Sequence, residues 1–381
     1  MHSLPLLVGV LLASFLVGAV PALVTALKPH LQQRLNLDHE RVDRLERMRF
    51  FLAWVAGMPL AGYLADAWVR HDVRFDLLVA GCIGIAATVA FLGVTNSQRW
   101  VGAASFALGL ATSFLVVATI LLMPVAIPAA CPAAALNAGF IGIGLGSFAP
   151  HAVLRRLERW FGFRNALLVL GLGALIPAAF VFAGYAPSEA PARAAASSDF
   201  VHDVRFWLLA VMLILYYPIE SALDIWSGPF LQELGYRNRP GRTMLIGFWL
   251  SFLIARLAMY FLMGPLNEIW LLFFCALTSA IVLGNLVGAY GASAGGTGFW
   301  FVGACYGPLL PGVFGLLLEV SQGSQGLALG CMLAVAGLHD ALAHPLMGHT
   351  MHARPVRTAM RIPLIMTLLM LAPLLVFELV R

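Results

Sequence analysis

The chain has 381 residues, of which 61% are hydrophobic and only 11% charged, and its mean hydropathy is +0.89. This composition excludes an ordinary soluble domain and is typical of a protein that crosses a membrane many times. The 23 Lys and Arg residues exceed the 18 Asp and Glu residues, giving a net charge of +5, but the bases are scattered along loops. We therefore expect a lipid bilayer around the chain and no nucleic-acid partner.

Apolar segments long enough to cross a bilayer recur along the whole chain. A transmembrane helix needs about 20 predominantly apolar residues, and cutting the sequence at its polar and Pro/Gly-rich breaks predicts twelve such spans. They cover residues 4–28, 49–67, 74–95, 99–123, 132–153, 163–185, 204–231, 243–264, 268–288, 297–320, 325–349 and 362–380. The first is too long and too uncharged at its start for a cleavable signal, so we expect it to remain as a span.

A Pro-, Ala- and Ser-rich stretch divides these spans into two sets of six. We expect an N-terminal half over 1–185, a cytoplasmic linker over 186–203 and a C-terminal half over 204–381. The second span closes with Gly62-Tyr-Leu-Ala-Asp66, and the eighth closes with Gly264-Pro-Leu-Asn-Glu268, a pattern of the same type at the same place. This repeat predicts an all-α membrane protein of twelve transmembrane helices in two pseudo-symmetric halves, an architecture found in transporters.

The end of the second span carries a recognisable signature. The stretch from Gly62 to His71 reads G-Y-L-A-D-A-W-V-R-H and resembles the G-x-x-x-D-R-x-G-R-R motif of the major facilitator superfamily. Gly62, Asp66 and Arg70 match, whereas Ala67 and Val69 stand where a base and a glycine are usual. In that family the acid and the bases form a cytoplasmic latch that steadies one conformation. The resemblance implies the same role for Gly62, Asp66 and Arg70.

The C-terminal half resembles the fucose-galactose-glucose proton symporter branch of that superfamily. Tyr216-Tyr-Pro-Ile-Glu220 followed by Trp226 is similar to the Y-x-G-x-E...W pattern of the seventh span in that branch. Phe248-Trp249 with Arg256 is similar to the F-W...G-R pattern of its eighth span. Members of the branch carry acids in spans one and four that take part in proton coupling. Neither of those spans contains an Asp or Glu in this chain, so we expect any proton coupling to use other residues.

Two carboxylates inside the seventh span are the strongest functional signal. At about 100° per residue, Tyr217, Glu220 and Asp224 fall on one helical face, with Tyr216 one turn from Glu220. A charge at the bilayer centre costs roughly 2.5–3.5 kcal/mol, so such acids usually face a cavity or a protein interior. A carboxyl in such a site can exchange a proton near neutral pH. Glu220 is the first candidate and Asp224 the second. The alternatives are a structural hydrogen bond for Glu220 and a water-facing helix end for Asp224.

Other polar groups within the spans are candidates for the same site. Arg256 is the base deepest inside a span, where it either approaches Glu220 or bonds to backbone carbonyls. In span eleven, Asp340 and His344 share a face and predict a polar patch or a second proton group. The histidines of that span step by five residues, unlike the i, i+4 pair that a metal prefers. The predicted solute or proton site therefore contains no metal and comprises Tyr216, Tyr217, Glu220, Asp224, Trp226, Arg256, Asn137, Asn285, Asp340 and His344.

Loop charges oppose the membrane orientation that the resemblance implies. With both termini in the cytoplasm most bases fall outside, whereas the positive-inside rule predicts the reverse. We keep cytoplasmic termini because Gly62 to Arg70 belongs to the cytoplasmic side in the superfamily. The predicted location is the plasma membrane or a bacterial inner membrane.

These features together predict a secondary active transporter that moves a small polar solute by alternating access. A sugar is the leading solute and proton symport the leading coupling. An exporter of amphipathic or drug-like compounds and a transport-inactive membrane sensor or assembly partner are the two alternatives. We expect neither enzymatic activity nor a cofactor, because no catalytic triad order, phosphate loop or metal spacing is present.

Overall fold

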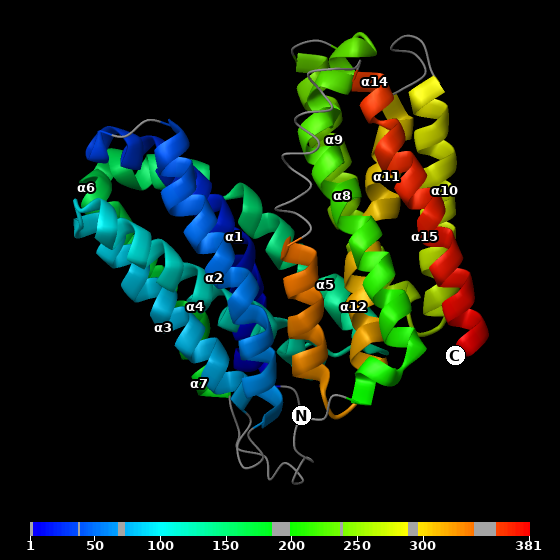
Figure 1. Ribbon diagram of the computed structural model, residues 1–381, viewed down its shortest axis with the longest axis horizontal. Coiled ribbons are helices and arrows are strands. Elements are labelled where there is room, and N and C mark those ends of the chain that lie inside the picture. The colour runs from blue at the N-terminus through cyan, green and yellow to red at the C-terminus, as the bar shows by residue number, and fades with distance from the viewer. Residues whose placement is uncertain are drawn as a thin grey trace. The chain divides into compact units, whose positions relative to one another are not determined.

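The structure is a computed structural model that describes residues 3–36, 39–67, 73–184, 199–236, 239–288, 296–338 and 356–381. Within these ranges every named element is a helix (Figure 1). Within the described residues nine helical stretches, three of which join two consecutive helices, are long and apolar enough to cross a membrane, and two shorter apolar helices accompany them. Together with α8 (Val204–Glu233), these stand in the chain order of the expected spans. The chain packs as two compact units.

Unit 1 consists of residues 1–128, 139–198 and 322–334. The span α4 lies against α2 and α3 and is the most buried of the unit, with 78% of its apolar stretch covered. The helices of the unit are α1 (Leu4–Leu35), α2 (His39–Ala67), α3 (Val73–Val94), α4 (Gln98–Ala126), the greater part of α5 (Pro132–Phe148), α6 (Pro150–Gly173), α7 (Ile176–Gly184) and most of the helix Gln325–Leu338.

Unit 2 consists of residues 129–138, 199–321 and 335–381. Here α8 packs against α15, and α9 packs against α11. The expected tenth span is divided into two helices around Gly307 and Pro308, since proline has no N–H to continue the hydrogen-bond ladder. The helices are the 3₁₀ turn η1 (Asp199–His202), α8, α9 (Arg239–Leu262), α10 (Glu268–Gly288), α11 (Gly296–Tyr306), α12 (Leu309–Val320), α14 (Val356–Ala359) and α15 (Arg361–Val380).

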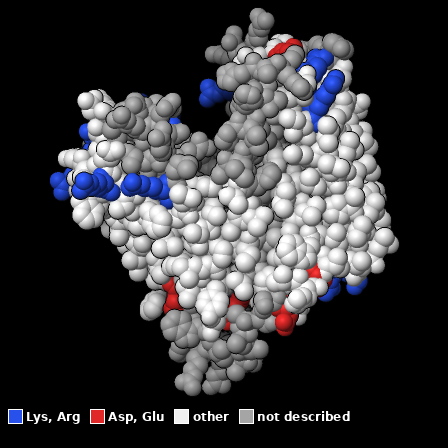
Figure 2. Space-filling view, viewed as in Figure 1, with Lys and Arg blue, Asp and Glu red and all other residues white. Residues whose placement is uncertain are grey.

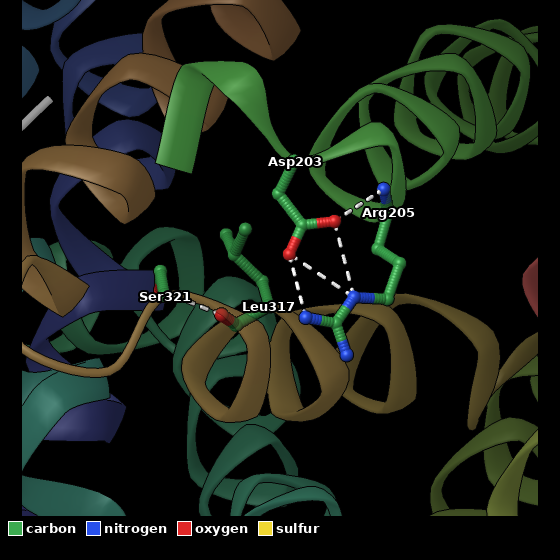
Figure 3. Close-up of polar contacts among 4 residues, drawn as sticks. All are labelled: Asp203, Arg205, Leu317 and Ser321. Carbon is green, nitrogen blue, oxygen red and sulfur yellow. Dashed lines mark hydrogen bonds and ion pairs between the residues drawn. The ribbon is translucent and has the colours of Figure 1, made fainter. Parts of the chain in front are cut away.

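Polar side chains fix two helix ends in unit 2 (Figure 3). Asp203 caps α8 by accepting from the backbone N–H of Arg205 at 2.8 Å, and its second oxygen accepts from the Arg205 guanidinium at 2.6 Å. These hydrogen bonds lower the pKa of the Asp203 carboxyl. At the end of α12 the Ser321 hydroxyl donates to the Leu317 carbonyl at 2.6 Å. The Asp203 contact occupies a backbone N–H that a helix start would otherwise leave unpaired, whereas the Leu317 carbonyl also accepts from the Ser321 backbone N–H at 3.0 Å.

Close helix contacts in unit 1 depend on glycine. A Cβ atom on Gly109 of α4 would lie 2.1 Å from the backbone oxygen of Phe50 on α2. A Cβ on Gly18 of α1 would lie 1.9 Å from the backbone oxygen of Ile143 on α5. Small residues of this kind let two helix backbones approach in a membrane, where dispersion contacts rather than water drive association.

The fifth span ends earlier than its sequence composition predicts. We expected it to run from 132 to 153, but α5 ends at Phe148 and Pro150 begins α6. A second break follows at Gly162, whose φ of 74° and ψ of 162° interrupt the helix. Residues 150–161 therefore form a separate helical segment between span five and span six. The predicted division into halves at 185 and 204 falls beside residues outside the described ranges and stays a prediction.

We expect Gly109→Ala to lower the thermal stability of the purified protein. The added methyl group meets a backbone oxygen that has no rotamer to change, and overpacking of this kind costs about 1–3 kcal/mol. Gly173→Ala is the matched control because nothing lies within 4 Å of its Cβ position. Thermal unfolding in detergent measures both variants. Equal melting temperatures for the two variants would contradict the close α2–α4 contact.

Candidate functional site

The middle of α8 presents aromatic and acidic side chains toward neighbouring helices of unit 2. Tyr216 is buried, and Tyr217 and Glu220 are partly exposed. The Tyr216 hydroxyl donates to the backbone carbonyl of Tyr306 on α11 at 3.3 Å. The ring of Tyr217 meets that of Tyr216 edge-on, with centroids 6.2 Å apart. The helix continues through Pro218. The hydrogen bond of Tyr216 thus holds this part of α8 against α11. Glu220 lies one helical turn further along α8 than Tyr216.

A cavity lies within unit 2 beside this part of α8. The empty space between its lining residues is about 210 Å³ including space open to solvent, but none of it is wide enough for a water-sized sphere, so the site is closed to a solute in this conformation. Glu220 contributes the one carboxyl of its lining. Three aromatic residues of α9 form much of the wall, with centroid separations of 5.1 Å between Phe248 and Trp249 and 5.4 Å between Trp249 and Phe252. The lining residues are Tyr216, Ile219, Glu220, Leu223, Phe248, Trp249, Phe252 and Tyr306.

Arg256 packs against this aromatic wall. Its side chain is almost fully buried, with 3% exposed, and its Nε donates to the carbonyl of Gly307 at 2.8 Å. The guanidinium carbon lies 4.4 Å from the ring centroid of Phe252, within the range of a cation–π contact. The carbonyl contact that the sequence allowed is present, and Arg256 also interacts electrostatically with Glu220. The carbonyl belongs to the break between α11 and α12.

Three further predicted site residues that the structure describes do not belong to the cavity lining. Asn137 of α5 is fully buried, and its Nδ2 donates to the Ala133 carbonyl at 2.9 Å and to the Met263 sulfur at 3.3 Å. Trp226 is also fully buried, whereas Asn285 of α10 is exposed. The side chain of Asp224 and all of Asp340 and His344 lie outside what the structure describes. Their roles stay predictions.

The acid of the predicted latch is engaged with a helix start. Asp66 is buried, with 9% of its surface exposed. One carboxylate oxygen accepts from the N–H of Gly326 at 2.9 Å and the other from the N–H of Leu327 at 2.7 Å. These amides open the helix Gln325–Leu338, where free N–H groups and the helix dipole favour an anion. The contact lies within unit 1. Arg70 lies outside the described residues.

A glycine pair makes this contact possible. A Cβ atom on Gly62 would lie 2.1 Å from the backbone oxygen of Gly326, and one on Gly326 would lie 2.5 Å from that of Gly62. The motif alone identified Gly62 and Asp66, but it could not name their partner, which is 260 residues further along the chain.

The second copy of the repeat has a related but different contact, which the sequence did not predict. Glu268 begins α10 and is buried, with 6% exposed. Burial and a hydrogen bond with Glu268 raise the pKa of the Cys131 thiol to about 12. Cys131 immediately precedes α5, so each repeat places its acid near the start of another helix. The one feature of the sequence that could have indicated this contact is the position of Glu268, which matches that of Asp66 in the repeated G-x-L-x-acid pattern.

Comparison with known proteins finds similarity in the fold but not in the sequence. No family model and no curated protein matches the sequence. The structure, however, matches the fucose:proton symporter FucP of E. coli with a TM-score of 0.79 at 14% identity, covering 99% of each chain. It also matches the proton:xylose symporter XylE with a TM-score of 0.74 at 13% identity, covering 97% of this chain and 94% of that one.

A third match is the human organic anion transporter MFSD10, with a TM-score of 0.71 at 15% identity, covering 97% of this chain and 99% of that one. At such identities these matches show the fold alone, which is the major facilitator fold over nearly the whole chain. The predicted all-α membrane fold is thereby confirmed. The chain is a multi-pass membrane protein with this fold.

Proposed function

We propose that the protein is a secondary active transporter that carries a small polar solute, with a sugar as the first candidate, by proton-coupled alternating access. The observation that carries this proposal is the cavity of unit 2, which combines aromatic rings with the single carboxyl of Glu220. The shared fold supports it, because two proteins that match over almost their entire length are described as proton symporters of fucose and xylose.

The chemistry of the lining suits a sugar. Aromatic faces pack against the C–H face of a sugar ring, while a carboxylate accepts hydrogen bonds from its hydroxyl groups. Glu220 is neutral when protonated and costly to bury when charged. A solute hydroxyl that hydrogen-bonds to the carboxylate adds to the attraction that Arg256 exerts on its charged form, whereas a proton neutralises the carboxylate. Solute and proton binding at one carboxyl are thereby linked.

Glu220→Gln should abolish uphill solute uptake driven by a pH gradient while leaving solute exchange intact. The amide keeps the shape and hydrogen-bonding capacity of the side chain but cannot take up or release a proton. Uptake and counterflow in liposomes measure the two activities. Glu233→Gln, in the exposed last turn of the same helix, is the matched control and should retain both. Unchanged uphill uptake in Glu220→Gln would reject the coupling role.

A second candidate is export of amphipathic compounds. Seven of the eight residues that line the cavity are apolar or aromatic, and Arg256 is not among them. A screen of sugars, organic acids and cationic drugs by thermal shift distinguishes the candidates, since a ligand that binds the folded state raises its stability. Counterflow of any of these solutes in liposomes would exclude a transport-inactive sensor.

The latch is part of the same proposal. The Asp66 carboxylate accepts two hydrogen bonds from backbone N–H groups, which join the end of α2 to the start of the helix Gln325–Leu338. Alternating access requires these hydrogen bonds to break in one half of the transport cycle. While they hold, the residue just before that helix stays covered, since Ser324 is 6% exposed.

Asp66→Asn should therefore make this helix start accessible more often. The amide removes the negative charge and directs N–H groups toward the backbone donors, and losing such a cap costs about 0.5–2 kcal/mol. In a cysteine-free background carrying Ser324→Cys, maleimide labelling should accelerate about 2- to 30-fold. Asp76→Asn, at the exposed first turn of α3, should leave the rate unchanged. Equal labelling rates in both variants would refute the latch.

The proposed orientation places both termini in the cytoplasm. A cysteine at Ser197, in the predicted linker, should then react with a membrane-impermeant maleimide only after the cells are permeabilised. A cysteine at Asn165, at the base-rich end of unit 1, should react in intact cells. The reverse pattern would show that the positive-inside rule prevails over the resemblance.

A further inference from the structure

The helical segment 150–161 is bounded by two breaks and lies at one end of unit 1. It starts at Pro150 and stops at Gly162. Its length of about 18 Å is too short to cross a bilayer core of about 30 Å. His30 near the end of α1 contacts the segment through Glu158 at 3.5 Å, which places the segment at that end of the unit, where Figure 1 labels α6. Because span five precedes it and span six follows it, the segment lies at the membrane boundary.

Its side chains separate into two faces. At about 100° per residue, the apolar residues cover one side and the polar residues the other. The apolar face carries Val153, Leu154, Leu157, Trp160 and Phe161, and the polar face carries His151, Arg155, Arg156, Glu158 and Arg159.

Only part of the apolar face packs against the protein. Leu154 is 1% exposed, whereas Trp160 is 63% and Phe161 51% exposed. Tryptophan and phenylalanine on the apolar side of an amphipathic helix are the residues that enter the boundary between headgroups and acyl chains. The exposed part of this face thus suits lipid.

The polar face carries an excess of positive charge. Arg155, Arg156 and Arg159 are all exposed, and the one acid of the segment, Glu158, faces His30. Among the described residues no ion pair involves these three arginines. The guanidinium of Arg156 lies 5.0 Å from the ring centroid of Trp160, so charge and apolar anchor are adjacent. In Figure 2, Lys and Arg side chains gather at this end of unit 1, while the acids visible on that unit lie toward its other end.

We propose that the segment 150–161 binds the anionic headgroups of phospholipids in the adjacent leaflet. Arg155, Arg156 and Arg159 contact the phosphates, and Trp160 and Phe161 enter the acyl boundary beneath them. A basic, aromatic helix held by spans on both sides has the charge and the apolar surface that such a lipid needs. This surface is independent of the cavity of unit 2.

The test uses the full-length protein in neutral detergent micelles. Dioleoyl phosphatidylglycerol should raise the melting temperature in a saturable manner, and dioleoyl phosphatidylcholine should raise it less. Inorganic phosphate at the same concentration should have no comparable effect, because it lacks the acyl chains. The difference between the two lipids should shrink in high salt, which screens exposed charges. Equal shifts with both lipids, or an equal shift with phosphate alone, would overturn the proposal.

Variants locate the effect on the segment. Replacing Arg155, Arg156 and Arg159 together by Gln should weaken phosphatidylglycerol binding about tenfold or more. Replacing the same three by Lys should retain most of it. The matched control replaces Arg99, Arg242 and Arg361 by Gln, three exposed arginines elsewhere in the chain, and should bind like the wild type. Retained binding in the first triple variant, or an equal loss in the control, would place the site elsewhere.

Discussion

Every peptide N–H and C=O group inside a bilayer must find a partner within the protein, because no water is present to replace one. Unbroken helices meet this requirement by themselves, but breaks and helix ends do not. Two buried charges meet it here. Arg256 donates to the Gly307 carbonyl where α11 gives way to α12, and Asp66 accepts from the first amides of the helix Gln325–Leu338. Charged side chains inside this chain thus serve backbone groups at positions where the helices are interrupted.

This requirement explains which features the sequence could predict. The spans follow from hydropathy, and the common helical face of Tyr217 and Glu220 follows from the periodicity of a helix. The contact between Asp66 and Gly326 joins residues 260 positions apart, and no local pattern encodes it. Tyr306 was missed as a lining residue for the same reason. Its place opposite Tyr216 depends on how α11 packs.

Other differences between the expected and the observed structure do have a local signal in the sequence, but averaging hydropathy over a window hides it. Pro150 and Gly162 are the residues that begin and interrupt helices, yet a window set for span length merges the segment between them with its neighbours. Trp226 lies six residues beyond Glu220, so at about 100° per residue it points well away from the carboxyl. The structure buries it outside the cavity lining. A helical wheel of each segment, rather than its average hydropathy, identifies both features.

The Gly62–Gly326 contact has a consequence for how the sequence can change over time. Each glycine meets the backbone of the other, and a backbone atom cannot become smaller to accommodate a new side chain. A larger residue at either position therefore has no compensating substitution across the contact, whereas a pair of packed side chains can exchange volume. Most of the chain can drift while a few backbone contacts cannot.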